Sequence, residues 1–274
     1  MTPSSTTIGV FDSSVGGLSV LHHIRHHLPH AHLIYIADSA HVPYGDKSSA
    51  FIEQRSHTLA RFLIDQGAHA IVVACNTATA ATISTLRKNF TLPIIGMEPA
   101  VKPAVAATRS GVVGVLATTG TLESARFAAL LERYAGEVNI VTQSCPGLVE
   151  QVEQGDLNGP QTRELIERYT AHLLARGADT LILGCTHYPF LAPLIRKMVG
   201  ANITLVDTGE AVARQLQYRM QSELPAHVNP VRPEPVEGHG TTFFTSGDSV
   251  EAARILSVLW GENVAVQPLP QMFL

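Results

Sequence analysis

The chain has 274 residues, of which 45% are hydrophobic and 15% charged, and this composition excludes a disordered protein. Its formal net charge of −4 and the lack of a basic run do not favour a nucleic-acid partner. No apolar run is long enough to span a membrane, and the N-terminus lacks the pattern of a signal peptide. Three cysteines without a C-x-x-C pair predict a cytoplasmic protein with reduced thiols.

Short apolar runs alternate with amphipathic stretches in the first part of the chain. The runs predict four buried strands, at 8–11, 33–36, 70–74 and 93–96. Between them, apolar residues at helical spacing predict helices over 20–28, 51–66 and 78–90.

The same order of elements returns in the second part of the chain. It predicts strands at 111–116, 138–141, 181–184 and 203–206, and helices over 127–134, 165–176 and 189–198. Strands that are apolar throughout and alternate with helices indicate an α/β fold of mainly parallel sheets flanked by helices.

The two halves also resemble each other residue by residue. Residues 66–70 precede the first cysteine strand as 176–180 precede the second, and 9–13 align with 114–118. A repeat of this size indicates two pseudo-symmetric domains with the active site in the cleft between them. The alternative is a coincidence among phrases that are common in α/β proteins.

The end of the chain has no counterpart in the repeat. We expect a helix over 212–220, a proline-rich exposed loop over 229–238, a strand at 241–245 and a helix over 250–260. This tail is predicted to pack back onto the first domain. The predicted boundaries are therefore 1–98 plus 210–274 for the first domain and 99–209 for the second.

Two similar turns are the best candidates for chemistry. Residues 75–77 (Cys-Asn-Thr) and 185–187 (Cys-Thr-His) each follow a buried strand and precede a helix. Ligands of parallel sheets bind beyond the carboxyl ends of the strands, so we expect the two thiols to face each other across a cleft. A helix N-terminus lowers the pKa of a thiol, which would then exchange a proton near neutral pH. The alternative is that each cysteine is a small buried hydrophobe.

Two polar residues are placed to assist these thiols. His187 follows Cys185 by two residues, and Asp12 stands at the end of a strand that neighbours the one before Cys75. Residues 12–17 are small and open the first helix, which suits either an anion site or an ordinary N-cap.

Other conspicuous residues predict no function. Cys145 is interpreted as packing. The histidines at positions 22, 23, 26, 27, 30 and 32 lie mostly off the apolar stripe of the first helix, so we expect solvated rings and no metal site. No glycine-rich nucleotide motif follows a strand.

Together these motifs resemble the glutamate racemases of the cofactor-independent aspartate/glutamate racemase superfamily. The resemblance spans about residues 8 to 250. The matching motifs are Phe11-Asp12-Ser13, Val15 to Val20, Asp38, Val42 to Gly45, Ala74 to Thr79, Glu98 to Ala100 and Gly184 to Pro189. Two features depart from the family: glycine is usual where this chain has Ser14, and the stretch 229–238 is an insertion. A positive φ at position 14 would strain a serine.

The resemblance implies that the chain interconverts L- and D-glutamate, without cofactor or metal, and supplies D-glutamate for peptidoglycan. It implies that Cys75 acts on the D enantiomer and Cys185 on the L enantiomer, with Asp12 and His187 as assistants. Inversion without a cofactor needs a base on one face of Cα and an acid on the other. The implied substrate-binding residues are Asp12, Ser13, Tyr44, Gly45, Asn76, Thr77, Thr186 and His187, with Thr118, Thr121 and Glu153 as further candidates.

The family commonly forms homodimers, so the resemblance also implies a dimer. Three alternatives stay open on the sequence. The first is a racemase for aspartate or another amino acid, and the second is a non-catalytic protein that binds a dicarboxylate. The third is a thiol redox protein, which would need a disulfide-forming pair.

Overall fold

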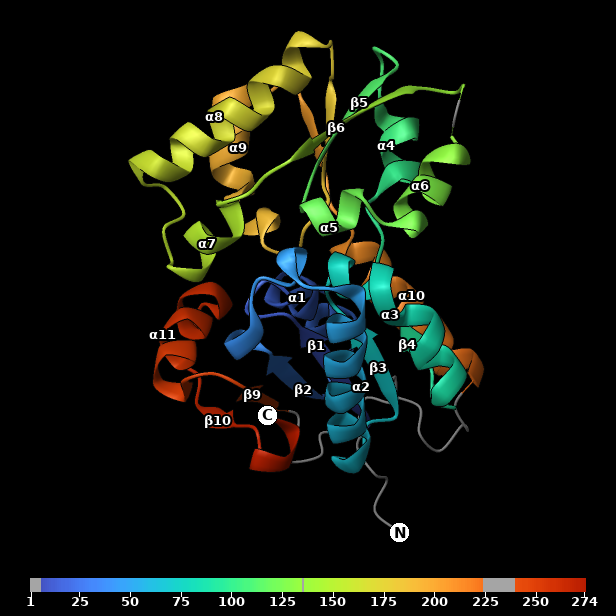
Figure 1. The fold of residues 1–274 in the computed structure, drawn as a ribbon, viewed down its shortest axis with the longest axis vertical. Coiled ribbons are helices and arrows are strands. Elements are labelled where there is room, and N and C mark those ends of the chain that lie inside the picture. The colour runs from blue at the N-terminus through green and yellow to red at the C-terminus, as the bar shows by residue number, and fades with distance from the viewer. Residues whose placement is uncertain (1–5, 135, 224–239) are drawn as a thin grey trace.

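Two parallel sheets, each flanked by helices, lie one above the other in the computed structural model, which describes residues 6–134, 136–223 and 240–274 (Figure 1). We call the sheet that holds the N-terminal strand, with its helices, the first lobe, and the other sheet with its helices the second lobe. The predicted proline-rich loop at 229–238 lies outside the described residues. No helix in the described ranges combines the length and the apolar character needed to cross a membrane.

The first lobe contains a six-stranded parallel sheet. In pairing order its strands are β10 (Val266–Pro268), β9 (Thr241–Thr245), β2 (His32–Ala37), β1 (Thr7–Asp12), β3 (Ala70–Val73) and β4 (Ile94–Ile95). Its helices are α1 (Leu18–His27), α2 (Ser49–Asp65), α3 (Asn76–Asn89), α10 (Gly209–Glu223) and α11 (Ser249–Trp260). Short 3-10 turns lie at Ser39–His41, Tyr44–Asp46 and Gln271–Phe273. The tail returns to this lobe, since β9 pairs with β2.

The second lobe contains a four-stranded parallel sheet. In pairing order its strands are β6 (Asn139–Ser144), β5 (Val112–Ala117), β7 (Thr180–Leu183) and β8 (Thr204–Val206). Its helices are α4 (Val101–Ala107), α5 (Thr119–Leu122), α6 (Ala125–Glu132), α7 (Leu148–Glu153), α8 (Pro160–Ala175) and α9 (Ala192–Val199), with a 3-10 turn at Tyr188–Leu191.

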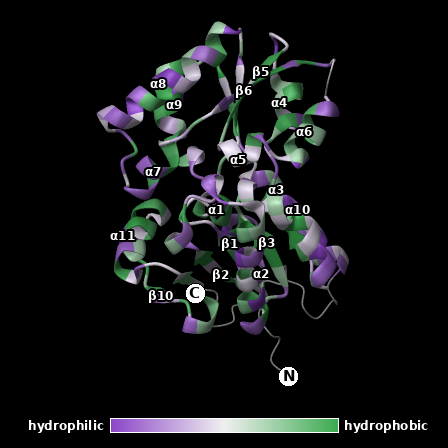
Figure 2. Ribbon diagram, in the orientation of Figure 1, coloured by the Kyte–Doolittle hydropathy of each residue, from purple (hydrophilic) through white to green (hydrophobic). Residues whose placement is uncertain are grey.

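The central strands are apolar because helices cover both faces of each sheet. All four residues of β3 and all four of β7 are buried. Figure 2 shows β1 and β3 mostly in the hydrophobic colour, whereas the helices carry hydrophilic residues on their outer sides. Burial on both faces removes the alternation of polar and apolar residues, as the sequence predicts.

The predicted repeat is confirmed in strand order and register. The order β2-β1-β3-β4 in the first lobe matches β6-β5-β7-β8 in the second. Gly9 of β1 pairs with the second residue of β3, and Gly114 of β5 pairs with the second residue of β7. A Cβ at either glycine would clash with a leucine of the crossing helix, Leu63 in α2 and Leu173 in α8. Both lobes therefore use glycine for the same close helix–sheet contact.

Several details differ from the predictions. The expected helix over 189–198 is divided into the 3-10 turn at Tyr188–Leu191 and the shorter α9. The short elements α4, α5, α7 and β10 were not predicted. They span between three and seven residues, which is too short for a clear hydrophobic period. The proposed domain boundaries stay a prediction, although each sheet draws its strands from one side of them.

Candidate active site

The carboxyl ends of the central strands of both sheets meet between the lobes, where α5 of the second lobe faces α3 of the first and α7 lies over α11 (Figure 1). A small pocket lies at this meeting point. It is lined by Ser13, Pro43, Tyr44, Gly45, Cys75, Asn76, Thr77, Thr118, Val149, Cys185, Thr186 and His187. The structure thus brings both cysteines and most of the predicted binding residues to one cavity. Only about 10 Å³ is left between these side chains, room for roughly one water molecule.

Cys75 is the N-cap of α3. Its sulfur accepts the backbone N–H of Ala78 at 3.4 Å and lies 3.9 Å from Ser13 Oγ. Burial raises the pKa of this thiol well above its ordinary value, and the neighbouring Asp12 carboxyl raises it further, while the Ala78 N–H lowers it. The expectation that the helix N-terminus lowers this pKa is therefore wrong, because desolvation outweighs one capping hydrogen bond.

Asp12 lies behind the pocket rather than in its lining, and it is fully buried. Its Oδ1 accepts the Ser13 N–H at 2.6 Å and the Ser13 hydroxyl at 3.1 Å. Its Oδ2 accepts the Thr186 hydroxyl at 3.0 Å. Burial raises the pKa of Asp12, against the charge of His187 and these hydrogen bonds, which lower it. The carboxyl therefore orients two pocket residues and also interacts with the Cys75 thiol.

Cys185 has a histidine as its neighbour instead of a cap. Its sulfur lies 3.7 Å from His187 Nδ1, and His187 Nε2 lies 2.5 Å from Glu153 Oε1. Burial alone would lower the pKa of His187, but the hydrogen bonds with Cys185 and Glu153 raise it well above its ordinary value. The raised pKa favours the protonated, positively charged form of the imidazole beside the sulfur.

Hydrogen bonds between the lobes close the pocket. Thr186 of the second lobe donates to Asp12 of the first, and its backbone oxygen accepts the Ser19 hydroxyl at 2.8 Å. The hydroxyls of Thr77 and Thr118 meet at 2.9 Å. Thr121, which was a predicted binding residue, stands behind this pair at 3.2 Å from Thr77 and is not in the lining.

Tyr44 is held in place by a buried ion pair. Its hydroxyl donates to Asp38 Oδ2 at 2.6 Å, and Arg55 donates to both oxygens of Asp38 at 3.1 and 2.7 Å. Arg55 also donates to the backbone oxygen of Phe273 at 3.1 Å. The pair fixes one wall of the pocket and ties it to the end of the chain.

Asn76 is the clearest sign of a ligand-binding cavity. The residue is 4% exposed, and neither its amide nitrogen nor its oxygen has a hydrogen-bond partner among the described residues. A buried polar group without a partner costs free energy, so such groups need an explanation. Its place in the pocket lining makes a polar ligand the natural partner.

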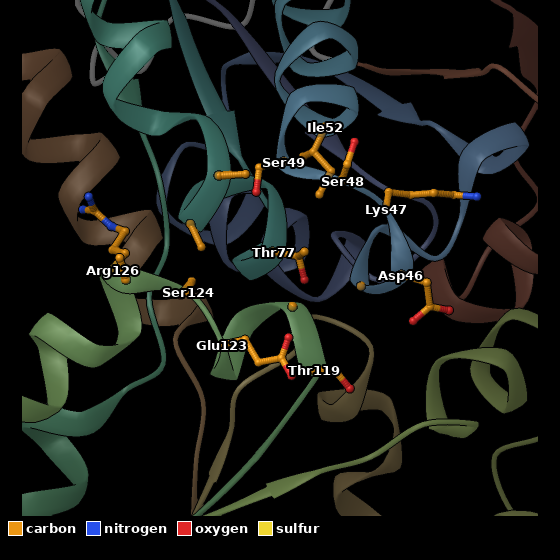
Figure 3. Close-up of a pocket in the computed structure, with 15 residues that line it drawn as sticks. Asp46, Lys47, Ser48, Ser49, Ile52, Thr77, Thr119, Glu123, Ser124 and Arg126 are labelled. Atoms are coloured by element: carbon orange, nitrogen blue, oxygen red, sulfur yellow. The ribbon is translucent and has the colours of Figure 1, made fainter.

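A wider cleft of about 800 Å³ opens beside the small pocket and shares Gly45 and Thr77 with it (Figure 3). Lys47, Ser48 and Ser49 line it from the first lobe. Glu123, Ser124 and Arg126 face them from the second lobe. The cleft therefore offers a polar path along the boundary of the lobes towards the cysteines.

Two other expectations are corrected by the structure. No non-glycine residue in the described ranges has a positive φ, so Ser14 is not strained there. Four of the six clustered histidines are half-buried rather than solvated; for example, His23 and His27 contact Glu210 of α10 at 3.3 and 3.0 Å. Within the described ranges, no group of three or more potential ligands is placed to hold a metal ion. Cys145 is buried outside the pocket lining, as its interpretation as packing requires.

The sequence did not reveal some residues that shape the site. Val149 lines the pocket, and Arg55 acts through Tyr44. Ser14 contacts Glu153, which in turn contacts His187. The one sequence feature that singles out Ser14 is its departure from the glycine expected at that position.

Comparison with known proteins supports the family resemblance that the sequence motifs indicate. A sequence model of the family described as Asp/Glu/Hydantoin racemase matches residues 8–216. The chain is 54% identical over 272 residues to a glutamate racemase from Stutzerimonas stutzeri, which covers 98% of this chain and 100% of that protein.

Solved structures agree with the sequence match. A glutamate racemase isoform from Bacillus anthracis superposes with a TM-score of 0.85 at 30% identity, covering 97% of this chain and 98% of that one. The Escherichia coli glutamate racemase, solved with L-glutamate and the activator UDP-MurNAc-Ala, gives a TM-score of 0.83 at 33% identity. That match covers 96% of this chain and 97% of the Escherichia coli chain.

Proposed function

Because the chain belongs to the Asp/Glu/Hydantoin racemase family, we propose that Cys75 and Cys185 are the acid and the base of a glutamate racemase. The activity, interconversion of L- and D-glutamate by an isomerase, is that of the relatives that match nearly the whole chain. One observation carries the mechanism: a single pocket is lined by one cysteine from each of two equivalent strand ends.

The proposed reaction moves one proton off Cα and another onto it. In the L-to-D direction the Cys185 thiolate takes the Cα proton, and the electron pair of the broken C–H bond spreads into the α-carboxylate. The Cys75 thiol then gives its proton to the opposite face of Cα. The reaction leaves a thiol at Cys185 and a thiolate at Cys75, which is the arrangement that the reverse direction needs.

The charges around the sulfurs support this assignment of directions. The raised pKa keeps Cys75 protonated near neutral pH, ready to donate. The charged imidazole of His187 lies beside Cys185, where a thiolate is needed. In the reverse direction the Asp12 carboxyl, which interacts with the Cys75 thiol, would assist removal of its proton.

Neutral donors in the lining would hold the carboxylates of the substrate. The carbanion at Cα is hard to form, and hydrogen bonds to the α-carboxylate stabilise its negative charge in a site that excludes water. We assign this role to Ser13, Asn76, Thr77, Thr118 and Thr186, with the Tyr44–Gly45 turn as the facing wall. Since the pocket leaves about 10 Å³, glutamate enters only when the lobes separate along the cleft of Figure 3.

We further propose that the D-glutamate formed supplies peptidoglycan synthesis in the cytoplasm and that the chain acts as a homodimer. The first follows from the use of D-glutamate that the family resemblance implies. Sedimentation equilibrium at micromolar concentration tests the second, and a mass of one chain would refute it.

Turnover in D₂O tests the substrate and the mechanism together. Purified protein is incubated with L-glutamate in D₂O. The two enantiomers are then separated, and the deuterium content at Cα of each is measured by mass spectrometry. We expect deuterium in the D-glutamate formed and nearly none in the L-glutamate recovered early, because two different groups handle the two faces.

Each alternative gives a different result. Faster turnover of aspartate would identify a racemase of another specificity. Binding of glutamate without inversion or exchange would identify a non-catalytic binding protein. A disulfide between Cys75 and Cys185 after mild oxidation, together with no turnover in the reduced protein, would favour a thiol redox protein.

A further inference from the structure

Ser14 joins the two lobes through its hydroxyl group. Its Oγ donates to Glu153 Oε2 at 2.8 Å, and the hydroxyl of Ser39 lies 2.8 Å from the same Oγ. Since a carboxylate only accepts and the Ser14 proton is used towards it, Ser39 is the donor in the second contact. Ser14 belongs to the loop between β1 and α1 of the first lobe, whereas Glu153 ends α7 of the second.

The direction of this hydroxyl is fixed by the buried backbone around it. Ser14 is fully buried, and its backbone oxygen accepts the hydroxyl of Tyr35 at 2.5 Å. The next backbone N–H, that of Val15, points at Glu153 Oε1 at 3.4 Å. The loop therefore presents two donors to one carboxylate of the opposite lobe.

The same carboxylate holds His187. Glu153 Oε1 lies 2.5 Å from His187 Nε2, and the other ring nitrogen faces the Cys185 sulfur at 3.7 Å. Glu153 is 19% exposed at its side chain, whereas His187 is 2% exposed. Without its partners in the first lobe, this partly exposed carboxylate would be free to turn towards solvent.

We propose that Ser14 is a positioning residue for the reaction: its hydroxyl holds Glu153 against His187 and so fixes the imidazole beside Cys185. The inference rests on the proposed racemase function, which supplies the role of Cys185. It adds a residue of the first lobe to the support of the second-lobe cysteine. Because Ser14 and Glu153 are on different lobes, the contact forms only when the cleft is closed, so the imidazole is held during turnover and released on opening.

Ser14→Ala tests the proposal, since alanine keeps the backbone and removes only the hydroxyl. We expect kcat/KM for L-glutamate to fall about 10-fold, because small displacements of reacting groups have large effects on rate. Ser56→Ala is the matched control: Ser56 is also fully buried, its hydroxyl has no partner within the described part of the chain, and it lies in α2 outside the pocket lining. Thermal unfolding of both variants separates a loss of stability from a loss of positioning.

A double-mutant cycle shows whether Ser14 acts through Glu153. In the Glu153→Ala background, Ser14→Ala should lower kcat/KM by less than twofold, because the group that it holds is gone. An equal loss in both backgrounds, or a Ser14→Ala variant within twofold of the unaltered chain, would overturn the proposal.

The titration of His187 gives a readout that does not depend on turnover. The ring is followed by NMR in ¹³C-histidine-labelled protein and assigned with His187→Asn. We expect its pKa to fall in Ser14→Ala and to stay unchanged in Ser56→Ala, since the contact with Glu153 raises it. An unchanged His187 titration in Ser14→Ala would refute the positioning role. If the unaltered chain fails to racemise glutamate, the proposed function is wrong, and this titration still decides whether Ser14 holds Glu153 on His187.

Discussion

The two cysteine turns are equivalent in backbone and different in the groups that serve them. When β1 is aligned with β5 and β3 with β7, Asp12 corresponds to Ala117, and Thr77 corresponds to His187. The first turn thus has its proposed assistant, Asp12, on the neighbouring strand, and the second has its proposed assistant, His187, two residues after the cysteine. A shared fold supplies the two opposed faces that inversion needs, whereas the assistants are supplied separately in each lobe.

The difference extends to how each sulfur is held. Cys75 caps α3 and lies by a carboxyl group, whereas Cys185 precedes a 3-10 turn and lies by an imidazole. The opposite lobe also supports each proposed assistant. Thr186 of the second lobe donates to Asp12, and Ser14 of the first lobe donates to Glu153, which in turn contacts His187. Closure of the lobes therefore completes both halves of the proposed site at once.

Replacement of either thiol should have the largest effect. We expect Cys75→Ser and Cys185→Ser to lower racemisation about 10³-fold, since general acid–base groups contribute rate factors of this order. The rate is followed by polarimetry from each enantiomer.

Cys145→Ser is the control for these variants, because Cys145 is buried but lies outside the pocket lining. It should retain at least half of the activity. Full racemisation by Cys75→Ser or by Cys185→Ser would refute the two-thiol mechanism. The two cysteine turns would then not be equivalent parts of one site.

Replacement of the assistants should have a smaller and unequal effect. We expect Asp12→Asn and His187→Asn each to lower kcat/KM about 10²-fold. The two enantiomers have equal free energies, so kcat/KM must stay equal in the two directions. The difference between the assistants should therefore appear in kcat and KM taken separately, with the L-to-D and D-to-L values of kcat changed by different factors.

Full progress curves from each enantiomer give these constants. His57→Asn, at a histidine of α2 that packs on Phe90, is the control and should leave both directions unchanged. If the two assistant variants change kcat by the same factor in both directions, the assistants are not specialised, and the difference between the turns has no kinetic consequence.

The repeat and the cysteines could be predicted because they depend on local patterns. Buried parallel strands are apolar throughout, and both cysteines follow such strands directly. The contacts between Ser14 and Glu153 and between Asp38 and Arg55 join residues that are 139 and 17 positions apart. No local pattern encodes such a partner. The raised pKa of Cys75 also escaped prediction, because it depends on how completely the two lobes bury the thiol.

The first lobe contains a buried ion pair that can be tested through stability. We expect Arg55→Met to lower the free energy of unfolding by about 3 kcal/mol, because it leaves the Asp38 carboxylate buried without its cation. It should also raise KM, since Tyr44 loses its fixed acceptor geometry. Urea unfolding and steady-state kinetics measure the two effects, and an unchanged KM would show that Tyr44 does not depend on the pair.

The pH dependence of this stabilisation has a definite sign. Burial raises the pKa of Asp38, but the hydrogen bonds from Arg55 and Tyr44 and the charge of Arg55 lower it more, so its folded pKa is below the ordinary value. The contribution is therefore present above the unfolded pKa of about 3.9 and is lost as pH falls through the folded value. Arg55→Met should be less sensitive to acid over this range than the unaltered chain.

The smallest expected effects concern the residue before each cysteine strand. His69 Nδ1 accepts the Thr7 N–H at 3.1 Å, whereas its counterpart Asp179 accepts Thr108 Oγ1 at 2.6 Å and the N–H groups of Arg109 and Ser110 at 2.8 Å each. The hydrogen bonds from Thr108, Arg109 and Ser110 outweigh desolvation and lower the pKa of Asp179.

We therefore expect Asp179→Ala to lower the free energy of unfolding by about 2 kcal/mol and His69→Ala to lower it by about 1 kcal/mol, because hydrogen bonds to a charged group are stronger than those between neutral groups. Urea unfolding near neutral pH measures both. Neither variant should change kcat, since both residues lie at the amino ends of strands whose carboxyl ends hold the cysteines. Equal costs would mean that the two lobes differ only around the pocket. A change in kcat would mean that the amino ends of the strands also influence the thiols.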